Sequence, residues 1–349
     1  MENNQLKKLT LTATDAGTTY TERFRSLCEC VELTVKGRVE AGTSIVYALF
    51  GYEESGKEVL IYDKTLPLTE DGNFDYVHVF DPVSLAVYQS TVEYRACVKC
   101  AGSYSVNITM AEFEQTADGA PHERKCKNQY PDHPLKNVLF VGNSILLGFE
   151  NRYGMCASSP RADYAYHVQQ AILKQYPDCQ FYKAHGSPLE HAESLEAFEE
   201  AFGVIPNIHT QKPFVESLRP DLDLIILQIT DNVNTEKKYE TFHTSAELLL
   251  QRIRERCPNA VIVWVYGWYH KRAIHARVLE LCEQYAVEEA DVRCHRYKAN
   301  EAPRGAEYES IDGTKKRAQD NWISHPGDKG MKAIADTIIS VLKNTSLLQ

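Results

Sequence analysis

The sequence lacks the features that define several classes of protein. It has 38 Lys and Arg residues against 48 Asp and Glu residues, so its formal net charge is -10 and it has no basic excess. Proteins that bind nucleic acid need a basic surface to neutralise phosphates, and we therefore expect no nucleic-acid partner. No apolar segment approaches the ~18 residues that a membrane-spanning helix needs, and we expect no membrane insertion.

The amino terminus also lacks the pattern of a secretory signal. It reads MENNQLKKL, without an apolar segment or a small-residue cleavage site. We therefore expect a cytoplasmic location for the chain as it stands, or a secreted or periplasmic one if a leader has been removed. The sequence leaves the oligomeric state open.

Ten cysteines are scattered along the chain. Two pairs, Cys28 with Cys30 and Cys97 with Cys100, suggest a zinc site made of four thiolates. Both pairs lie in strand-like segments, however, and residues three apart on a strand face opposite sides of the sheet. We interpret the cysteines as free thiols that pack as small hydrophobic side chains, and we predict neither a metal nor a cofactor.

The first part of the chain has the pattern of an antiparallel β-protein. Short segments rich in β-branched and aromatic residues are separated by turn residues, and none shows a helical period. This pattern predicts an accessory β-sandwich of jelly-roll type over residues 1–133, ending in a polar segment that prolines interrupt. The expected strands are 8–13, 28–35, 44–51, 58–63, 75–80, 90–99 and 103–112.

The second part of the chain, residues 134–349, alternates apolar and amphipathic segments. Alternating strands and helices predict an α/β fold with a doubly wound parallel sheet, and nearly continuous apolar strands indicate burial on both faces. The expected strands are 138–141, 179–184, 222–229, 260–266 and 286–292. The expected helices are 162–176, 189–202, 239–256, 271–285 and 326–343.

Polar residues follow the first three of these expected strands. Gly142-Asn143-Ser144 ends the first, His185-Gly186-Ser187 the second and Thr230-Asp231-Asn232 the third, while His325 precedes the last helix. The carboxyl ends of parallel strands meet at one edge of a sheet, where α/β proteins bind ligands. A serine hydroxyl and an imidazole at that edge are a nucleophile and its base. A lone serine is more often a helix cap, but four positions in this order favour a hydrolase.

This order resembles the four-block pattern of the SGNH hydrolases, also called GDSL-type esterases and lipases, over about residues 137–345. The resemblance implies a flavodoxin-like SGNH domain in which Ser144 is the nucleophile and His325 is the general base. It also implies an oxyanion hole formed by the backbone N–H groups of Ser144 and Gly186 and by the side-chain amide of Asn232.

Three positions near these blocks depart from the family pattern. Asn143 precedes the serine where an Asp is usual, which leaves the nucleophile intact but changes the local charge. Thr230 stands where the third block usually has a glycine, and Val233 follows where an Asp is common.

The acid that normally lies three residues before the histidine is also missing, because Trp322 occupies that position. The group that orients the imidazole needs to accept a hydrogen bond but does not need to be a carboxylate. We rank the Trp322 carbonyl and the Asp320 side chain equally for this role. Asp328 ranks third, because within the helix it favours the amino-terminal dipole.

Residues close to the serine and glycine blocks are expected to shape the substrate site. Arg152, Tyr153 and Met155 lie in the segment that follows the serine block, and His185 precedes Gly186. We predict that these four side chains contact the substrate, with Arg152 able to bind a hydroxyl or a carboxylate.

The resemblance implies a serine esterase for short acyl esters, with an O-acetyl group on a carbohydrate as the preferred substrate. Family members with accessory sandwich domains often act on glycans, and aromatic side chains can stack on sugars. The expected partner is therefore a small-molecule or glycan ester. Two alternatives remain: a lipase or thioesterase for longer acyl chains, and a non-catalytic glycan-binding protein with a degenerate hydrolase domain.

Overall fold

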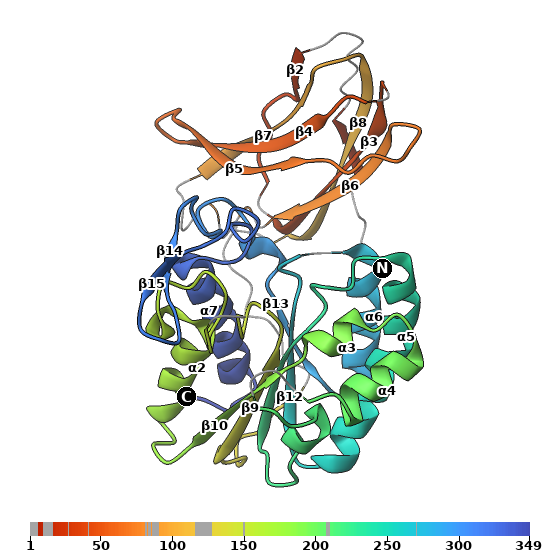
Figure 1. Cartoon of the computed structure of the whole chain (residues 1–349). Helices are drawn as coiled ribbons and strands as arrows, with labels where there is room; N and C mark the ends of the chain where they lie inside the picture. The colour runs from red at the N-terminus through yellow and green to blue at the C-terminus, as the bar shows by residue number, and fades with distance from the viewer. Residues whose placement is uncertain are drawn as a thin grey trace. The chain divides into compact units, whose positions relative to one another are not determined.

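The computed structural model describes the chain except for residues 1–5, 10–16, 27, 41, 81, 83–84, 86–90, 116–127, 149–150, 207–209 and 270. The chain divides into two compact units, Met1–Glu123 and Arg124–Gln349. Figure 1 shows that the first unit is made of strands, whereas helices flank a parallel sheet in the second. Both kinds of fold agree with the predicted fold class.

The described part of the first unit contains eight strands in two antiparallel sheets. They are β1 (Leu6–Leu9), β2 (Gly17–Tyr20), β3 (Cys28–Val39), β4 (Ile45–Glu53), β5 (Glu58–Thr65), β6 (Asn73–Phe80), β7 (Thr91–Cys100) and β8 (Tyr104–Gln115). One sheet has the order β1-β8-β3-β6 and the other β2-β7-β4-β5. This is the order of an eight-stranded jelly roll, so the predicted sandwich is confirmed.

Strand β3 illustrates why this sequence forms a two-layered sheet. Val31, Leu33 and Val35 are fully buried, whereas the intervening Glu32 and Thr34 are partly exposed. A period of two places alternate side chains on the inner face of the sandwich. Strand β2 was not expected, because Gly-Thr-Thr-Tyr shows no apolar alternation. Residues 10–13 of the first expected strand lie outside the described residues.

The cysteines of this unit give no support to a zinc site where they are described. Cys97 and Cys100 are buried free thiols on β7. The side chains of Cys28 and Cys30 lie outside the described part of the structure. Among the residues that the structure describes, no cluster of His, Cys, Asp and Glu has the arrangement of a metal site.

The second unit is built on a sheet of five parallel strands within its described residues. They are β9 (Asn137–Gly142), β10 (Gln180–His185), β11 (Leu224–Gln228), β12 (Val261–Tyr266) and β13 (Glu288–Asp291). Their order is β10-β9-β11-β12-β13, which is the flavodoxin-like order. Because β9 is flanked by β10 on one side and β11 on the other, the chain reverses direction across the sheet at β9. Ligands bind at such a reversal, beyond the carboxyl ends of the strands.

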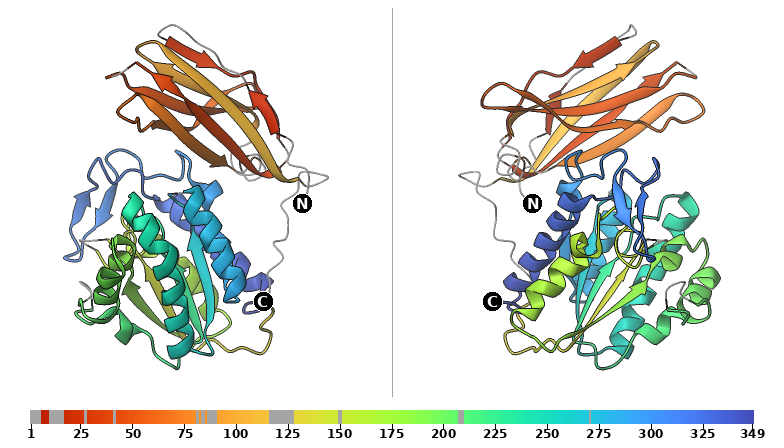
Figure 2. Two further views of the ribbon diagram at one scale, coloured as in Figure 1. Left: turned by 90° about the vertical axis from the view of Figure 1, so that its right-hand side faces the viewer. Right: turned by 60° about the vertical axis from the view of Figure 1, so that its left-hand side comes forward.

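Helices cover both faces of this sheet, as Figures 1 and 2 show. Alternate residues of β9 belong to different interior clusters: Val138 and Phe140 pack on one face, and Leu139 and Val141 on the other. The helices on the first face are α2 (Tyr164–Leu173) and α7 (Asp328–Asn344). Those on the second are α3 (Ser187–His191), α4 (Leu195–Gly203), α5 (Glu236–Arg256) and α6 (Arg272–Gln284). The sheet is therefore doubly wound, as predicted.

Two local features differ from the prediction. The expected helix 189–202 is two helices, because Ala192 is extended and the Ser194 side chain caps α4. The structure also contains a hairpin of β14 (Glu307–Glu309) and β15 (Lys315–Arg317). Its strands were missed because they are short and mostly charged, whereas the prediction relied on apolar segments.

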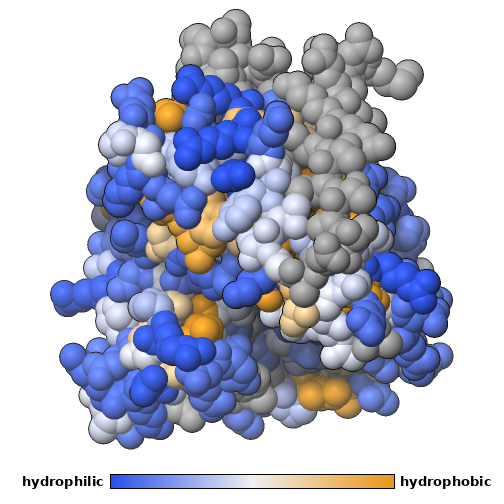
Figure 3. All heavy atoms as spheres, turned by 90° about the horizontal axis from the view of Figure 1, so that it is seen from above, coloured by the Kyte–Doolittle hydropathy of each residue, from blue (hydrophilic) through white to orange (hydrophobic). Residues whose placement is uncertain are grey.

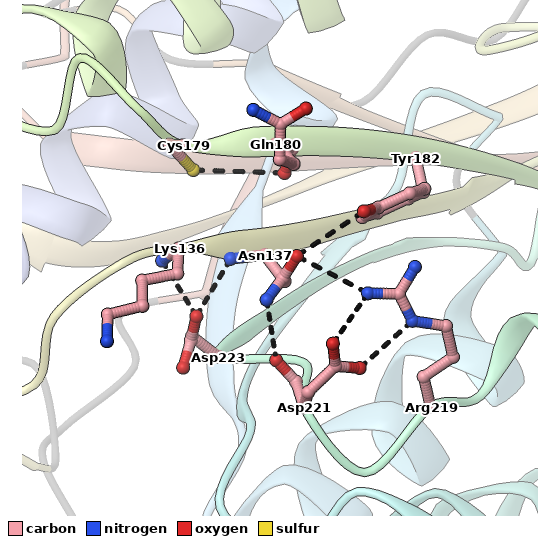
Figure 4. Close-up of polar contacts among 8 residues, drawn as sticks. All are labelled: Lys136, Asn137, Cys179, Gln180, Tyr182, Arg219, Asp221 and Asp223. Atoms are coloured by element: carbon pink, nitrogen blue, oxygen red, sulfur yellow. Dashed lines mark hydrogen bonds and ion pairs between the residues drawn. The ribbon is translucent and has the colours of Figure 1, made fainter.

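The amino-terminal ends of the central strands are joined by polar contacts, which Figure 4 shows. Asp223 Oδ2 accepts hydrogen bonds from the backbone N–H groups of Lys136 and Asn137 at 2.7 and 2.8 Å. The side chain of Asn137 contacts both the Asp221 carbonyl and the Arg219 guanidinium. These contacts fix the start of β9 against the segment that leads into β11, at the end of the sheet opposite Ser144.

The described apolar side chains lie mainly in the interior of each unit. On the face drawn in Figure 3, hydrophobic residues form small, separate patches among hydrophilic ones. Within the described residues, none of the helices combines the length and the apolar character that a membrane span requires.

Gly142, the last residue of β9, should be needed for close packing. A Cβ atom added there would lie 2.6 Å from Leu146 Cβ and 2.9 Å from Gln228 Oε1. We expect Gly142→Ala to lower the free energy of unfolding of the second unit by ~1–3 kcal/mol, measured by urea denaturation. Gly203→Ala is the matched control, because nothing lies within 4 Å of its added Cβ. Equal effects of the two substitutions would contradict the packing argument.

Candidate active site

Ser144 and His325 meet at the carboxyl edge of the parallel sheet. The Ser144 Oγ atom lies 2.9 Å from His325 Nε2. Ser144 follows β9 almost directly, and its carbonyl accepts a hydrogen bond of 2.8 Å from the N–H of Met155. His325 lies just before α7, and its carbonyl accepts a hydrogen bond of 2.9 Å from the N–H of Ala302. The main chain on each side of the contact is therefore held in place.

The second ring nitrogen of His325 identifies the tautomer of the imidazole. His325 Nδ1 lies 3.0 Å from the carbonyl oxygen of Trp322. A carbonyl oxygen can only accept a hydrogen bond, so Nδ1 must carry the proton. Nε2 then presents its lone pair to the hydroxyl of Ser144. The neutral imidazole is thus arranged to accept the serine proton.

The two aspartates that the sequence offered for orienting His325 lie elsewhere. Asp320 is exposed. Two successive turns precede His325, because the N–H of Trp322 donates to the Gln319 carbonyl and the N–H of His325 donates to the Trp322 carbonyl. These turns leave the Asp320 side chain in solvent. Asp328, in the first turn of α7, accepts hydrogen bonds from the backbone N–H and the hydroxyl of Ser158. The prediction for Asp320 is therefore not supported by its position, and the Trp322 carbonyl contacts the ring.

Residues that follow β12 hold the loop before His325. The indole N–H of Trp268 donates to the Ser324 carbonyl at 2.9 Å, and the Tyr269 hydroxyl lies 3.1 Å from Ser324 Oγ. The Tyr269 ring also meets the His325 imidazole edge-on, with centroids 5.7 Å apart. These contacts fix the imidazole from a third direction.

Burial sets the protonation state of His325. Desolvation of the half-buried ring lowers the pKa of His325 to about 4, and the positive charge of Arg296 acts in the same direction. The Trp322 carbonyl and the negative charge of Asp231 oppose this change in pKa. The imidazole is therefore neutral near pH 7, which is the form that a general base requires.

The three donors expected in the oxyanion hole differ in their availability. The N–H of Ser144 has no hydrogen-bond partner among the described residues. Asn232 Nδ2 donates one hydrogen to Glu190 Oε2 at 2.7 Å, which leaves its second hydrogen for another acceptor. The N–H of Gly186 donates to the Gly142 carbonyl at 2.6 Å. In this structure, Gly186 would have to break or share that bond to serve as an oxyanion donor.

Two buried carboxylates lie beneath the site. Glu190 on α3 is 1% exposed, and Asp231 after β11 is 8% exposed. The fully buried Asn143 connects them, because its Nδ2 atom lies 3.1 Å from Glu190 Oε1 and 3.1 Å from Asp231 Oδ2. The Gln228 amide donates to Asp231 Oδ2 as well. An amide at position 143 therefore fits an environment where the family's usual Asp would be a third buried carboxylate.

Of the four residues predicted to contact substrate, one is exposed and three are buried. Arg152 is exposed, whereas His185 is buried at the end of β10, paired with Gly142 in the sheet register. Tyr153 and Met155 are only 5% and 3% exposed, and the Tyr153 hydroxyl donates to the Glu309 carbonyl. Their side chains pack among buried apolar residues rather than face solvent.

The buried polar groups have little signature in the sequence. Glu190 lies in an amphipathic segment, where a glutamate usually marks the solvent-facing side of a helix. Tyr269 and Gln228 belong to no recognisable catalytic pattern. The available signal was Asn143 itself, because an amide in place of the usual acid suits acidic neighbours.

The environment of Asn143 predicts the effect of an aspartate at this position. Asn143→Asp would place a third carboxylate against Glu190 and Asp231, and we expect a loss of ~2–4 kcal/mol in the free energy of unfolding at pH 8. Because burial and like charge raise the pKa of the new group, the folded state binds more protons, and the loss should diminish as pH falls. Urea denaturation at pH 5.5 and pH 8 measures this. Asn321→Asp, at an exposed position, should show neither effect.

No protein-family model and no curated protein matches the sequence. Similar solved structures include a family two carbohydrate esterase from Cellvibrio japonicus, with 13% identity, 99% of each chain covered and a TM-score of 0.40. An extracellular lipase from Streptomyces rimosus has 13% identity over 59% of this chain and 99% of that chain, with a TM-score of 0.38. An acetyl xylan esterase from Butyrivibrio proteoclasticus has 12% identity over 98% of each chain, with a TM-score of 0.33. These distant likenesses assign no activity.

Proposed function

We propose that this chain is a serine esterase of the SGNH type that hydrolyses short acyl esters, in particular O-acetyl groups on carbohydrate. The observation that carries the proposal is the contact of 2.9 Å between Ser144 Oγ and His325 Nε2, with Nδ1 held by the Trp322 carbonyl. The contact lies at the carboxyl edge of β9, where the strand order reverses.

The geometry supports a two-step acyl transfer. Ser144 Oγ attacks the ester carbonyl carbon while its proton moves to His325 Nε2. The bond to the alcohol then breaks, and the alcohol leaves with the proton from Nε2. Water attacks the acyl-enzyme in the same way, which releases the carboxylic acid and restores the Ser144 hydroxyl.

The negative charge that develops on the ester oxygen needs donors near Ser144. The Ser144 N–H and the second hydrogen of the Asn232 amide fit this role, since neither has another acceptor among the described residues. Removal of one such donor usually lowers kcat by about 10²- to 10³-fold. The same loss is expected for Asn232→Ala.

A carbonyl behind the imidazole replaces the usual carboxylate of the triad. It fixes the tautomer and the ring orientation, but its partial charge stabilises the imidazolium less than a full negative charge does. The low pKa of His325 is consistent with this difference. His325 should therefore stay neutral over a wide pH range. Its protonated form is stabilised less, when it accepts the proton of Ser144, than it would be beside a carboxylate.

The acetyl and carbohydrate assignments are supported by the resemblance to the SGNH family and by the jelly-roll unit. Acetate release from a panel of acetylated sugars tests them. We expect release by the wild type, and a fall in kcat of about 10³-fold or more for Ser144→Ala. Ser340→Ala, on the exposed side of α7, should leave kcat unchanged.

Two further measurements separate the alternatives. A series of chromogenic acyl esters should show the highest kcat/KM for acetate, and a preference for long chains would indicate a lipase or thioesterase. A fluorophosphonate should label the wild type but not Ser144→Ala. Absence of labelling in both would indicate a binding protein with a degenerate hydrolase domain.

The position of Asp320 predicts that its carboxylate is dispensable. Because the Trp322 carbonyl holds His325 Nδ1, we expect Asp320→Asn to change kcat by less than about twofold. In a triad with an acid, the same substitution lowers kcat by about 10⁴-fold. Steady-state kinetics on an acetyl ester measure the difference, and a loss near that size would assign the orienting role to Asp320.

A further inference from the structure

Glu190 is a buried titratable group that the proposed mechanism does not use. It lies on α3 and is 1% exposed. Its carboxylate accepts hydrogen bonds from the backbone N–H of Thr230, from Asn232 Nδ2 at 2.7 Å and from Asn143 Nδ2 at 3.1 and 3.2 Å. One carboxylate thus joins the loop after β11 to the residue beside the nucleophile.

The backbone at Thr230 explains why this loop needs an external support. Thr230 has a φ of 143°, a region that β-branched residues rarely adopt and that glycine reaches without strain. The residue at this place in the SGNH pattern is usually glycine. Here a threonine adopts this backbone conformation, and its N–H donates to Glu190. Strained residues persist only where surrounding contacts determine their conformation.

We propose that Glu190 is a positioning residue that fixes the Thr230 backbone and the Asn232 amide in the orientation the oxyanion hole requires. This inference rests on the proposed esterase function, and it assigns to that site a residue outside the serine–histidine pair. Glu190 acts through Asn232, and it has no contact with the reacting atoms. One of the two Asn232 hydrogens is taken by Glu190, which turns the other toward a fixed direction.

The charge of Glu190 is part of this role. An ionised carboxylate only accepts hydrogen bonds and so matches three donors, whereas the protonated form presents a donor of its own. Burial, and then the negative charge of Asp231, raise the pKa of Glu190 to about 7. Asn232 should therefore be held less firmly as pH falls below 7.

The hydrogen bonds from Thr230, Asn232 and Asn143 oppose this rise in the pKa of Glu190. Cationic and titratable groups also lie close to the same network. Lys271 Nζ lies 2.8 Å from the Asp231 carbonyl, and its pKa is lowered by burial but raised by Asp231 and Glu190. Lys238 Nζ contacts the Asn232 carbonyl and His191 Nδ1. The pH dependence of the site thus reflects Glu190 within this set of charges.

The test is Glu190→Gln, which keeps the shape but replaces one acceptor oxygen with a donor. We expect kcat on an acetyl ester to fall ~10- to 100-fold while KM stays within about threefold, because the oxyanion contact forms in the transition state. Fluorophosphonate titration gives the number of active sites, so kcat is expressed per titrated serine. Glu193→Gln, at an exposed position close by in the chain, is the matched control and should behave as wild type.

The pH profile separates positioning from a merely structural role. In the wild type, kcat should decline as pH falls through about 7, well above the pKa of about 4 that burial gives His325. In Glu190→Gln this decline should be absent. If the variant does not fold, the wild-type profile decides alone, and a decline only near pH 4 overturns the proposal.

A second substitution tests the backbone argument. Thr230→Gly allows the observed φ without the hydrogen bond to Glu190. The double variant should therefore have a kcat about tenfold higher than Glu190→Gln alone. If kcat per titrated serine falls in Glu190→Gln and Thr230→Gly restores none of it, the loss does not act through the Thr230 backbone, and the proposal is overturned.

The two proposals fail in different ways. If Ser144→Ala retains full acetyl esterase activity, the proposed function itself is wrong. If Ser144→Ala is inactive and Glu190→Gln matches the wild type, only the inference about Glu190 is wrong.

Discussion

The imidazole of His325 is held from opposite sides, by Ser144 Oγ at 2.9 Å and by the Trp322 carbonyl at 3.0 Å. The same carbonyl also accepts the backbone N–H of His325 at 2.8 Å and lies 3.4 Å from Cys156 Sγ. Because burial raises the pKa of Cys156 to about 12, this thiol stays protonated and acts as a donor. One main-chain oxygen therefore fixes the tautomer, the ring orientation and the turn before α7, and the chemistry of the site depends on it.

The fold must also accommodate two buried carboxylates beneath the site. Burial of Glu190 and Asp231 near one another costs stability, and amides at Asn143, Gln228 and Asn232 offset that cost by donating to them. The Asn143 amide is the group that donates to both carboxylates.

The parallel sheet brings these groups together through its strand order. Ser144 follows β9, Asp231 follows β11 and Tyr269 follows β12, and these strands are neighbours in the sheet. Their amino-terminal ends are fixed by contacts such as those of Asp223 with Lys136 and Asn137. Rigid strands, fixed at one end, present loops of precise geometry at the other.

The sequence predicted the β-sandwich and the doubly wound sheet because hydrophobic periodicity is a local property. The expected strand 260–266 agrees with β12 to within one residue, since its apolar run is continuous. The break between α3 and α4 was missed, because an extended Ala192 leaves no glycine or proline signal. The charged hairpin of β14 and β15 was missed because it has no apolar period.

For the site, the sequence by itself determined which side chains could act, since Ser144, Asn232 and His325 follow recognisable patterns. Only the tertiary structure decided which acceptor faces the imidazole, because a backbone carbonyl has no signature in the sequence. It likewise decided that Glu190 is buried and that Gly186 donates to Gly142. These contacts join residues from separate strands and helices, and their geometry is set by how those elements pack rather than by local sequence.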